Sequence, residues 1–177
     1  MNLDVTPLFP SLLFQTVLEP FPQQKMMEIA YAVKEQYPSV EISNIGGYHS
    51  PPIKLEIEPL TAILNEIVSV PYTINNMWFM INGKDQYNTS HNHPQSDLSG
   101  VLYITDSQCP IEFEHPQYFE QYSLIKAYKN DQQLVHHVTP RAGQLILFPS
   151  SLRHRVLPND CEQDRISLSF NLTLETV

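Results

Sequence analysis

The chain has 177 residues, of which 42% are hydrophobic; this is enough for one sizeable core but short of what two ordinary domains need. We therefore expect a single domain spanning residues 1–177. Ten basic residues against nineteen acidic ones give a net charge of −9, which repels phosphate backbones and excludes nucleic acid as an expected partner.

The sequence carries no signal of export or membrane insertion. The first twenty residues contain Asp4, Glu19 and three prolines, and they lack the basic and apolar segments of a signal peptide. No later stretch approaches the ~18 apolar residues that a membrane span requires. Cys109 and Cys161 match neither a zinc knuckle nor a disulfide framework. We therefore expect a cytoplasmic protein with free thiols.

Two packing helices are predicted in the first seventy residues. The first runs from about Pro22 to Gln36 and ends before Pro38. The second begins after Glu58, and its apolar residues recur at i, i+3, i+4, i+7 and i+8: Leu60, Ile63, Leu64, Ile67 and Val68. Together they form a helical preface over about residues 1–71.

From Tyr72 onward, short apolar or alternating runs separated by turn residues are typical of strands in a sandwich or barrel. The predicted strands are 74–82, 98–104, 111–114, 134–138, 144–148, 155–157 and 165–174. Helices followed by an antiparallel double sheet define an α+β fold, with the barrel over about residues 72–177. Trp78 and Phe79 are predicted to pack in the core. The unpatterned segment 114–133 is predicted to be an insertion at the barrel mouth.

Three histidines form the first candidate site. His91 and His93 are two residues apart, so on an extended segment both side chains leave the same face. A His-x-His pair can also be a polar loop without a ligand, but His154, after a predicted strand and Pro149, can supply a third ligand. Three ligands on one side of an ion leave the other side open. The sequence therefore predicts a metal site, and the remaining histidines, His49, His115, His136 and His137, are assigned no role.

The predicted last strand is the second candidate. Arg165, Ser167, Ser169 and Asn171 alternate with Ile166, Leu168, Phe170 and Leu172. Such alternation usually places the polar face in water. In a barrel that encloses a ligand the inward face can be polar, and Arg165 then offers a bidentate fork to a buried carboxylate. The residues alone leave both interpretations open.

Several motifs occur together and in order: His91-Asn92-His93-Pro94, Leu98 to Ile104, Gly143 to Pro149, His154, and Arg165 to Asn171. With them the chain resembles the Fe(II)- and 2-oxoglutarate-dependent oxygenases. It is most similar to a small subgroup with His-x-His-Pro, Leu-Ser-Gly-Val and a closing Arg-Ile-Ser strand. The resemblance covers about residues 74–174. It implies a double-stranded β-helix, a jelly-roll or cupin-like barrel, preceded by packing helices.

The resemblance also implies an iron site. His91 matches the first ligand of the superfamily and His154 the distal one. His93 stands where the superfamily has a carboxylate ligand. Asp97, in a predicted turn, is a second candidate for that carboxylate.

A cosubstrate site is implied as well. Arg165 matches the residue that binds the distal carboxylate of 2-oxoglutarate, and Tyr103 and Ser167 are expected to hydrogen-bond the same carboxylate. The expected reaction uses Fe(II), 2-oxoglutarate and O2 to hydroxylate an unidentified small-molecule or peptide substrate, with release of succinate.

A cupin-like function is the alternative. Gly143, Pro149 and His154 match the second cupin motif, with Ser151 in the place of its second glycine. The rival functions are a three-histidine metal dioxygenase or isomerase that needs no 2-oxoglutarate, and a non-catalytic metal- or ligand-binding barrel. Arg165 discriminates between the 2-oxoglutarate-dependent oxygenase and these rivals, because a site without the cosubstrate needs no fixed guanidinium near the metal.

Overall fold

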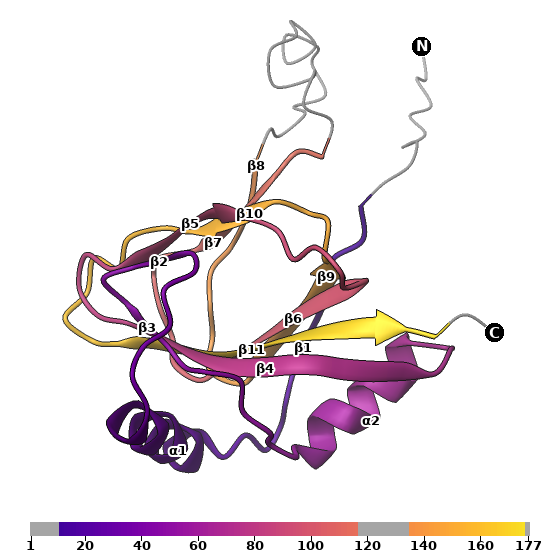
Figure 1. Ribbon diagram of the computed structural model, residues 1–177, viewed down its shortest axis with the longest axis horizontal. Coiled ribbons are helices and arrows are strands. Elements are labelled where there is room, and N and C mark those ends of the chain that lie inside the picture. The colour runs from indigo at the N-terminus through magenta and orange to yellow at the C-terminus, as the bar shows by residue number, and fades with distance from the viewer. Residues whose placement is uncertain (1–10, 117–134, 176–177) are drawn as a thin grey trace, which may run out of the picture.

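A computed structural model describes residues 11–116 and 135–175 of the chain. Two antiparallel sheets face each other, and both helices lie on the outer face of the larger one (Figure 1). The helices are α1 (Gln23–Gln36) and α2 (Glu58–Ile67). The expected α+β fold with an antiparallel double sheet is confirmed.

The larger sheet has the strand order β1 (Phe14–Val17), β9 (Gln144–Pro149), β6 (Leu98–Tyr103), β11 (Arg165–Leu174), β4 (Tyr72–Asn82), β3 (Tyr48–His49). The smaller sheet has the order β2 (Asn44–Ile45), β5 (Tyr87–His91), β10 (His154–Val156), β7 (Ile111–Glu114), β8 (Val135–Val138). Most neighbours are distant in sequence, so chain segments far apart are brought onto the same sheet.

The larger sheet buries both of its faces. On the outer face, Leu102, Leu145 and Leu168 pack in one cluster with Leu60 and Leu64 of α2. A second cluster fills the space between the sheets and contains Val101, Tyr103, Ile146 and Phe148 of the larger sheet with Ile111 and Phe113 of the smaller one. This double burial explains why β6 and β9 read as nearly continuous apolar runs rather than as clean alternation.

The helix ends follow from local chemistry. Tyr37, which caps α1, is extended because the residue before a proline is pushed out of the helical region, and Pro38 follows it. Helix α2 has a proline in its first turn, where no backbone N–H is needed. Neither helix in the described ranges is long and apolar enough to cross a bilayer.

The predicted elements agree with the observed ones to within one or two residues at each end, and β7 and β11 have the predicted bounds. Strands β1, β2, β3 and β5 were not predicted. The first three lie within the segment expected to be a helical preface, and they pair with β9, β5 and β4. Two-residue strands have no periodicity, and β5 is almost wholly polar. The predicted insertion at 114–133 lies largely outside the described residues, and the single domain over 1–177 stays a prediction.

Candidate metal and cosubstrate site

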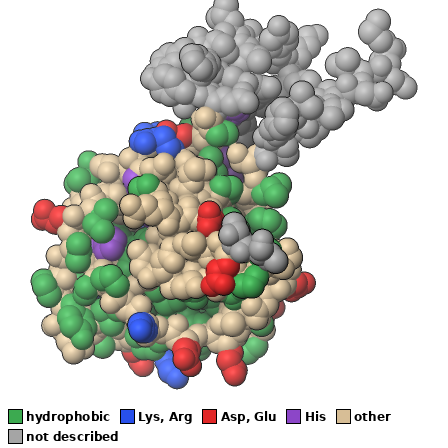
Figure 2. Space-filling view, turned by 45° about the vertical axis from the view of Figure 1, so that its right-hand side comes forward, with side chains coloured by type: hydrophobic (Ala, Val, Ile, Leu, Met, Phe, Trp, Pro, Cys, Tyr) green, Lys and Arg blue, Asp and Glu red, His purple; other side chains and the backbone are tan. Residues whose placement is uncertain are grey.

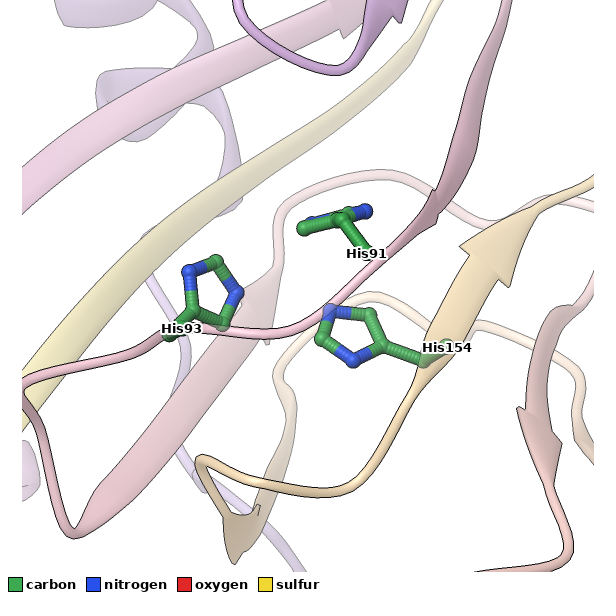
Figure 3. A group of neighbouring side chains, drawn as sticks. All are labelled: His91, His93 and His154. Carbon is green, nitrogen blue, oxygen red and sulfur yellow. The ribbon is translucent and has the colours of Figure 1, made fainter. Parts of the chain in front are cut away.

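The three predicted histidines lie together. His154, at the start of β10, is directly opposite His91, the last residue of β5. His93 follows two residues later, and the possible ligand atoms of the three rings all lie within 4.8 Å of one another. Figure 3 shows the rings gathered around a common space. Within residues 11–116 and 135–175, this is the only group of three or more His, Cys, Asp or Glu side chains that could hold an ion.

Backbone carbonyls orient two of the rings. The Nδ1 of His91 bonds the carbonyl oxygen of Thr89 at 2.7 Å, and the Nδ1 of His154 bonds that of Leu152 at 2.9 Å. Because a carbonyl oxygen only accepts, each Nδ1 carries the proton and each Nε2 keeps a lone pair. This is the tautomer that a metal ligand needs.

Burial keeps these imidazoles neutral. Desolvation, with the neighbouring histidines adding to it, lowers the pKa of His154 to about 3 and that of His93 to about 4. Desolvation also lowers the pKa of His91. Neutral imidazole is the form that binds a metal ion, so at neutral pH the cluster does not have to lose protons before binding one.

Asp97 does not join the cluster. Its Oδ2 accepts a hydrogen bond from the backbone N–H of Leu174 at 2.7 Å, and its own N–H donates to Leu172 at 2.8 Å. Asp97 therefore fixes the end of β11. In the part of the chain that the structure describes, the candidate ligands are three histidines without a carboxylate.

The polar face of β11 points into the space between the sheets. Arg165, Ser167, Ser169 and Asn171 are buried and line a cavity of about 230 Å³ that also contains the three histidines. Ile166 and Leu168 pack in the opposite cluster, toward the helices. The inward-facing interpretation of the alternation is therefore confirmed.

Arg165 is buried, and some of its hydrogen-bond donors have no acceptor. Its Nε and Nη1 and the hydroxyl of Tyr103 have no partner, and its Cζ lies 5.6 Å from the centre of the Tyr103 ring. Burial lowers the pKa of the guanidinium and raises that of Tyr103, and the interaction between the two groups opposes both shifts. No carboxylate among the described residues pairs with Arg165. A buried cation without a counter-charge is costly, so the arrangement fits an anion with two oxygens.

Two residues at this site were not predicted to take part. His49, in β3, was assigned no role, and Trp78 was predicted only to pack; both line the cavity. Their rings are stacked, with centroids 5.4 Å apart and an interplanar angle of 7°. A two-residue strand gives no periodic signal, so only the pairing of β3 with β4 shows where His49 lies.

A double sheet that encloses three convergent imidazoles and a buried guanidinium defines a metal-dependent β-barrel. Residues 76–171, more than half of the chain, match a family model described as "Putative 2OG-Fe(II) oxygenase". The chain belongs to this family. The expectations of a double-stranded β-helix and of an oxygenase that uses Fe(II) and 2-oxoglutarate are confirmed at this level.

Solved structures share the fold at low sequence identity. One is HygX from Streptomyces hygroscopicus with nickel and 2-oxoglutarate bound (TM-score 0.64, 13% identity, 92% of this chain and 82% of that chain). Another is SnoN, a non-heme alpha-ketoglutarate-dependent epimerase from nogalamycin biosynthesis (0.71, 13%, 93% and 77%). A third is a Pseudomonas putida prolyl-4-hydroxylase (0.57, 16%, 93% and 93%). No curated protein sequence matches the chain.

Proposed function

We propose that this oxygenase is a hydroxylase that holds Fe(II) with the Nε2 atoms of His91, His93 and His154 and pairs the distal carboxylate of 2-oxoglutarate with Arg165. The observation that carries the proposal is the buried Arg165, whose Nε and Nη1 have no partner, in the same cavity as the three histidines. A cupin-like enzyme without the cosubstrate gives no reason for this unpaired guanidinium.

Charge balance supports the same assignment. Three neutral imidazoles leave the full double positive charge on the ion, whereas a ligand set with a carboxylate would neutralise half of it. A dianion that chelates the metal with one carboxylate and meets Arg165 with the other halves the charge at the metal and neutralises the guanidinium. Two uncharged donors in the same cavity are the Tyr103 hydroxyl, which has no partner, and the hydroxyl of Ser167. We propose that both donate to the distal carboxylate.

When bound, Fe(II) together with 2-oxoglutarate and O2 supplies the oxidising power for hydroxylating a C–H bond, with release of succinate and carbon dioxide. The chain's own residues bind the metal and the cosubstrate and orient them in the cavity. The two Nδ1–carbonyl hydrogen bonds hold the rings of His91 and His154. Val101, Ile111 and Phe148 give the cavity an apolar wall, which disfavours water beside the metal site.

The proposed partner is a small molecule or a peptide. The face shown in Figure 2 carries only scattered Lys and Arg side chains among hydrophobic and acidic ones, and the net charge is −9. Such a surface does not favour nucleic acid. Cys109 and Cys161 are both free. Because a reducing compartment preserves thiols, we propose a cytoplasmic location.

The test is anaerobic titration of the Mn(II)- or Fe(II)-loaded protein with 2-oxoglutarate, followed by a succinate assay in air. Wild type should bind only when metal is present. Arg165→Ala leaves a buried carboxylate unpaired, a loss of ~3 to 5 kcal/mol that corresponds to a factor of hundreds to thousands in affinity. Arg165→Lys serves as the matched control, since it keeps the charge but loses the fork.

Equal affinity in wild type and Arg165→Ala would remove Arg165 from the site. If the metal-loaded wild type does not bind 2-oxoglutarate, the cupin-like function replaces the proposal. Binding without succinate would show that the three-histidine site holds the cosubstrate but does not turn it over.

A further inference from the structure

His49 and Trp78 form an aromatic row that leads to the metal cluster. Strand β3 pairs with β4, and this places the His49 ring parallel to the Trp78 indole. The indole in turn lies 5.7 Å from the ring of His93, tilted by 51°. The imidazole plane of His49 is therefore fixed by stacking, at a position that lines the same cavity as the candidate metal ligands.

One nitrogen of His49 is committed to the backbone. Its Nδ1 bonds the carbonyl oxygen of Ser50 at 2.8 Å, so Nδ1 carries the proton and Nε2 is an acceptor. Ser50 is itself fixed by two hydrogen bonds to Phe79. The N–H of Ser50 donates to the carbonyl oxygen of Phe79, and the Oγ of Ser50 accepts from the N–H of Phe79. Desolvation lowers the pKa of His49, which keeps the ring neutral.

The other nitrogen is left for a ligand. No hydrogen bond joins Nε2 of His49 to any described residue. The fully buried side-chain atoms without a partner are Asn82 Oδ1, the Tyr103 hydroxyl and two nitrogens of Arg165, and Nε2 is not among them. It therefore keeps accessible surface at a cavity wall. A structural histidine in a core normally satisfies both nitrogens.

The segments on either side of β3 supply an apolar rim to the same cavity. Val40, Ile42 and Pro52 line it, and Ile42 is 71% exposed, the most exposed large hydrophobic side chain in the described ranges. Among the residues that the structure describes, the lining contains no Asp, Glu or Lys, and Arg165 is its one Arg. Once 2-oxoglutarate has paired with Arg165, a charged substrate group would find no oppositely charged side chain in this lining.

We propose that His49 is a substrate-specificity residue: its Nε2 accepts a hydrogen bond from an O–H or N–H of an uncharged substrate whose apolar part rests on Val40, Ile42 and Pro52. The proposal rests on the proposed hydroxylase function, because it places the substrate beside a cavity already holding metal and cosubstrate. The substrate class is then neutral amphipathic molecules or segments with one hydrogen-bond donor.

The test uses 2-phenylethanol, its methyl ether, phenylacetate and 2-phenylethylammonium as probes of the Mn(II)- and 2-oxoglutarate-loaded protein. Paramagnetic relaxation of the probe protons reports binding near the metal without any turnover. Wild type should bind the alcohol about three to ten times more tightly than the ether, the range of one net neutral hydrogen bond, and should bind the two ions weakest.

The decisive variant is His49→Phe, which keeps a ring on Trp78 but removes the acceptor. It should bind alcohol and ether equally, with unchanged affinity for 2-oxoglutarate. His136→Phe, an exposed histidine outside the cavity lining, should behave as wild type. An undiminished alcohol preference in His49→Phe, preferred binding of either ion, or no relaxation of the alcohol in wild type overturns the proposal. If wild type fails to bind 2-oxoglutarate, the proposed function fails first and takes this inference with it.

Discussion

His154 lies directly opposite His91 in the antiparallel pair of β10 and β5, with ring centroids 4.4 Å apart. The next pair along these strands joins Val156 to Asn88. The register therefore shifts between the two pairs, and β5 carries an extra residue beside the cluster. Such bulges re-aim side chains next to functional sites. A one-residue slip of β10 would turn His154 to the opposite face of the sheet.

Loss of a strand histidine should remove the metal. We expect His91→Ala and His154→Ala to lower the affinity for Mn(II) or Fe(II) by more than about 100-fold, since even residues that only orient ligands cost 10- to 100-fold. His93→Ala should lose less metal affinity, because His93 lies beyond the end of β5 and its ring lacks the hydrogen bond to a backbone carbonyl that fixes the rings of His91 and His154.

Elemental analysis and Mn(II) titration of the purified variants measure this effect. His136→Ala is the matched control, since His136 is exposed and outside the cluster. A full complement of metal in His154→Ala would exclude the proposed site.

Tyr103→Phe should move stability and cosubstrate affinity in opposite directions. The Tyr103 hydroxyl is buried without a partner, so its removal should raise the unfolding free energy of the metal-free protein by about 1 kcal/mol. The same change removes a donor to the proposed carboxylate, and a hydrogen bond to a charged group is worth ~1.5 to 3 kcal/mol, or roughly 10- to 150-fold in affinity.

Urea unfolding and anaerobic 2-oxoglutarate titration of the same preparation separate the two effects. A variant that binds 2-oxoglutarate as tightly as wild type would exclude the hydroxyl as a donor to the carboxylate, and a destabilised variant would show that the hydroxyl has a structural role.

The metal-free protein should lose stability as the pH falls below 6.5. Above that value the imidazoles are neutral in both the folded and the unfolded chain. Below it the unfolded chain binds protons that the folded state excludes, because burial lowers the pKa of His93 to about 4 and that of His154 to about 3. The loss should level off only near these lower values.

Urea midpoints at pH 7 and pH 5 measure this loss. The double variant His93→Gln, His154→Gln cannot titrate at these positions and should show the smaller difference between the two pH values. Equal differences in both proteins would mean that other groups dominate the pH dependence.

Gly100→Ala should destabilise the larger sheet. A Cβ at Gly100 would lie 2.1 Å from Cζ of Phe170, its partner across β6 and β11. Phe170 is fully buried and cannot move aside, so we expect a loss of about 1 to 3 kcal/mol from overpacking.

Gly83→Ala is the control, since there the nearest atoms belong to the side chains of Asp164 and Gln86 at 3.2 and 3.3 Å. Its effect should stay within about 0.5 kcal/mol in chemical unfolding. A Gly100→Ala protein as stable as this control would contradict the observed packing.

The sequence alone determined the features whose signal is local. The 3.6-residue period of α2 and the period-two alternation of β11 follow from which residues face the core, so both elements were predicted nearly to the residue. The order of His91, His93, His154 and Arg165 along the chain was enough to suggest a metal and a carboxylate site.

Only the tertiary structure decided which face of β11 is enclosed and what lies beside it. Alternation is the same whether a polar face meets water or a cavity, and the outcome depends on a second sheet built from strands distant in sequence. The pairing of β3 with β4 likewise places His49 on Trp78, a contact between residues that share no local pattern. Long-range register, which is set by the packing of the whole double sheet, therefore fixes the site that local periodicity can only suggest.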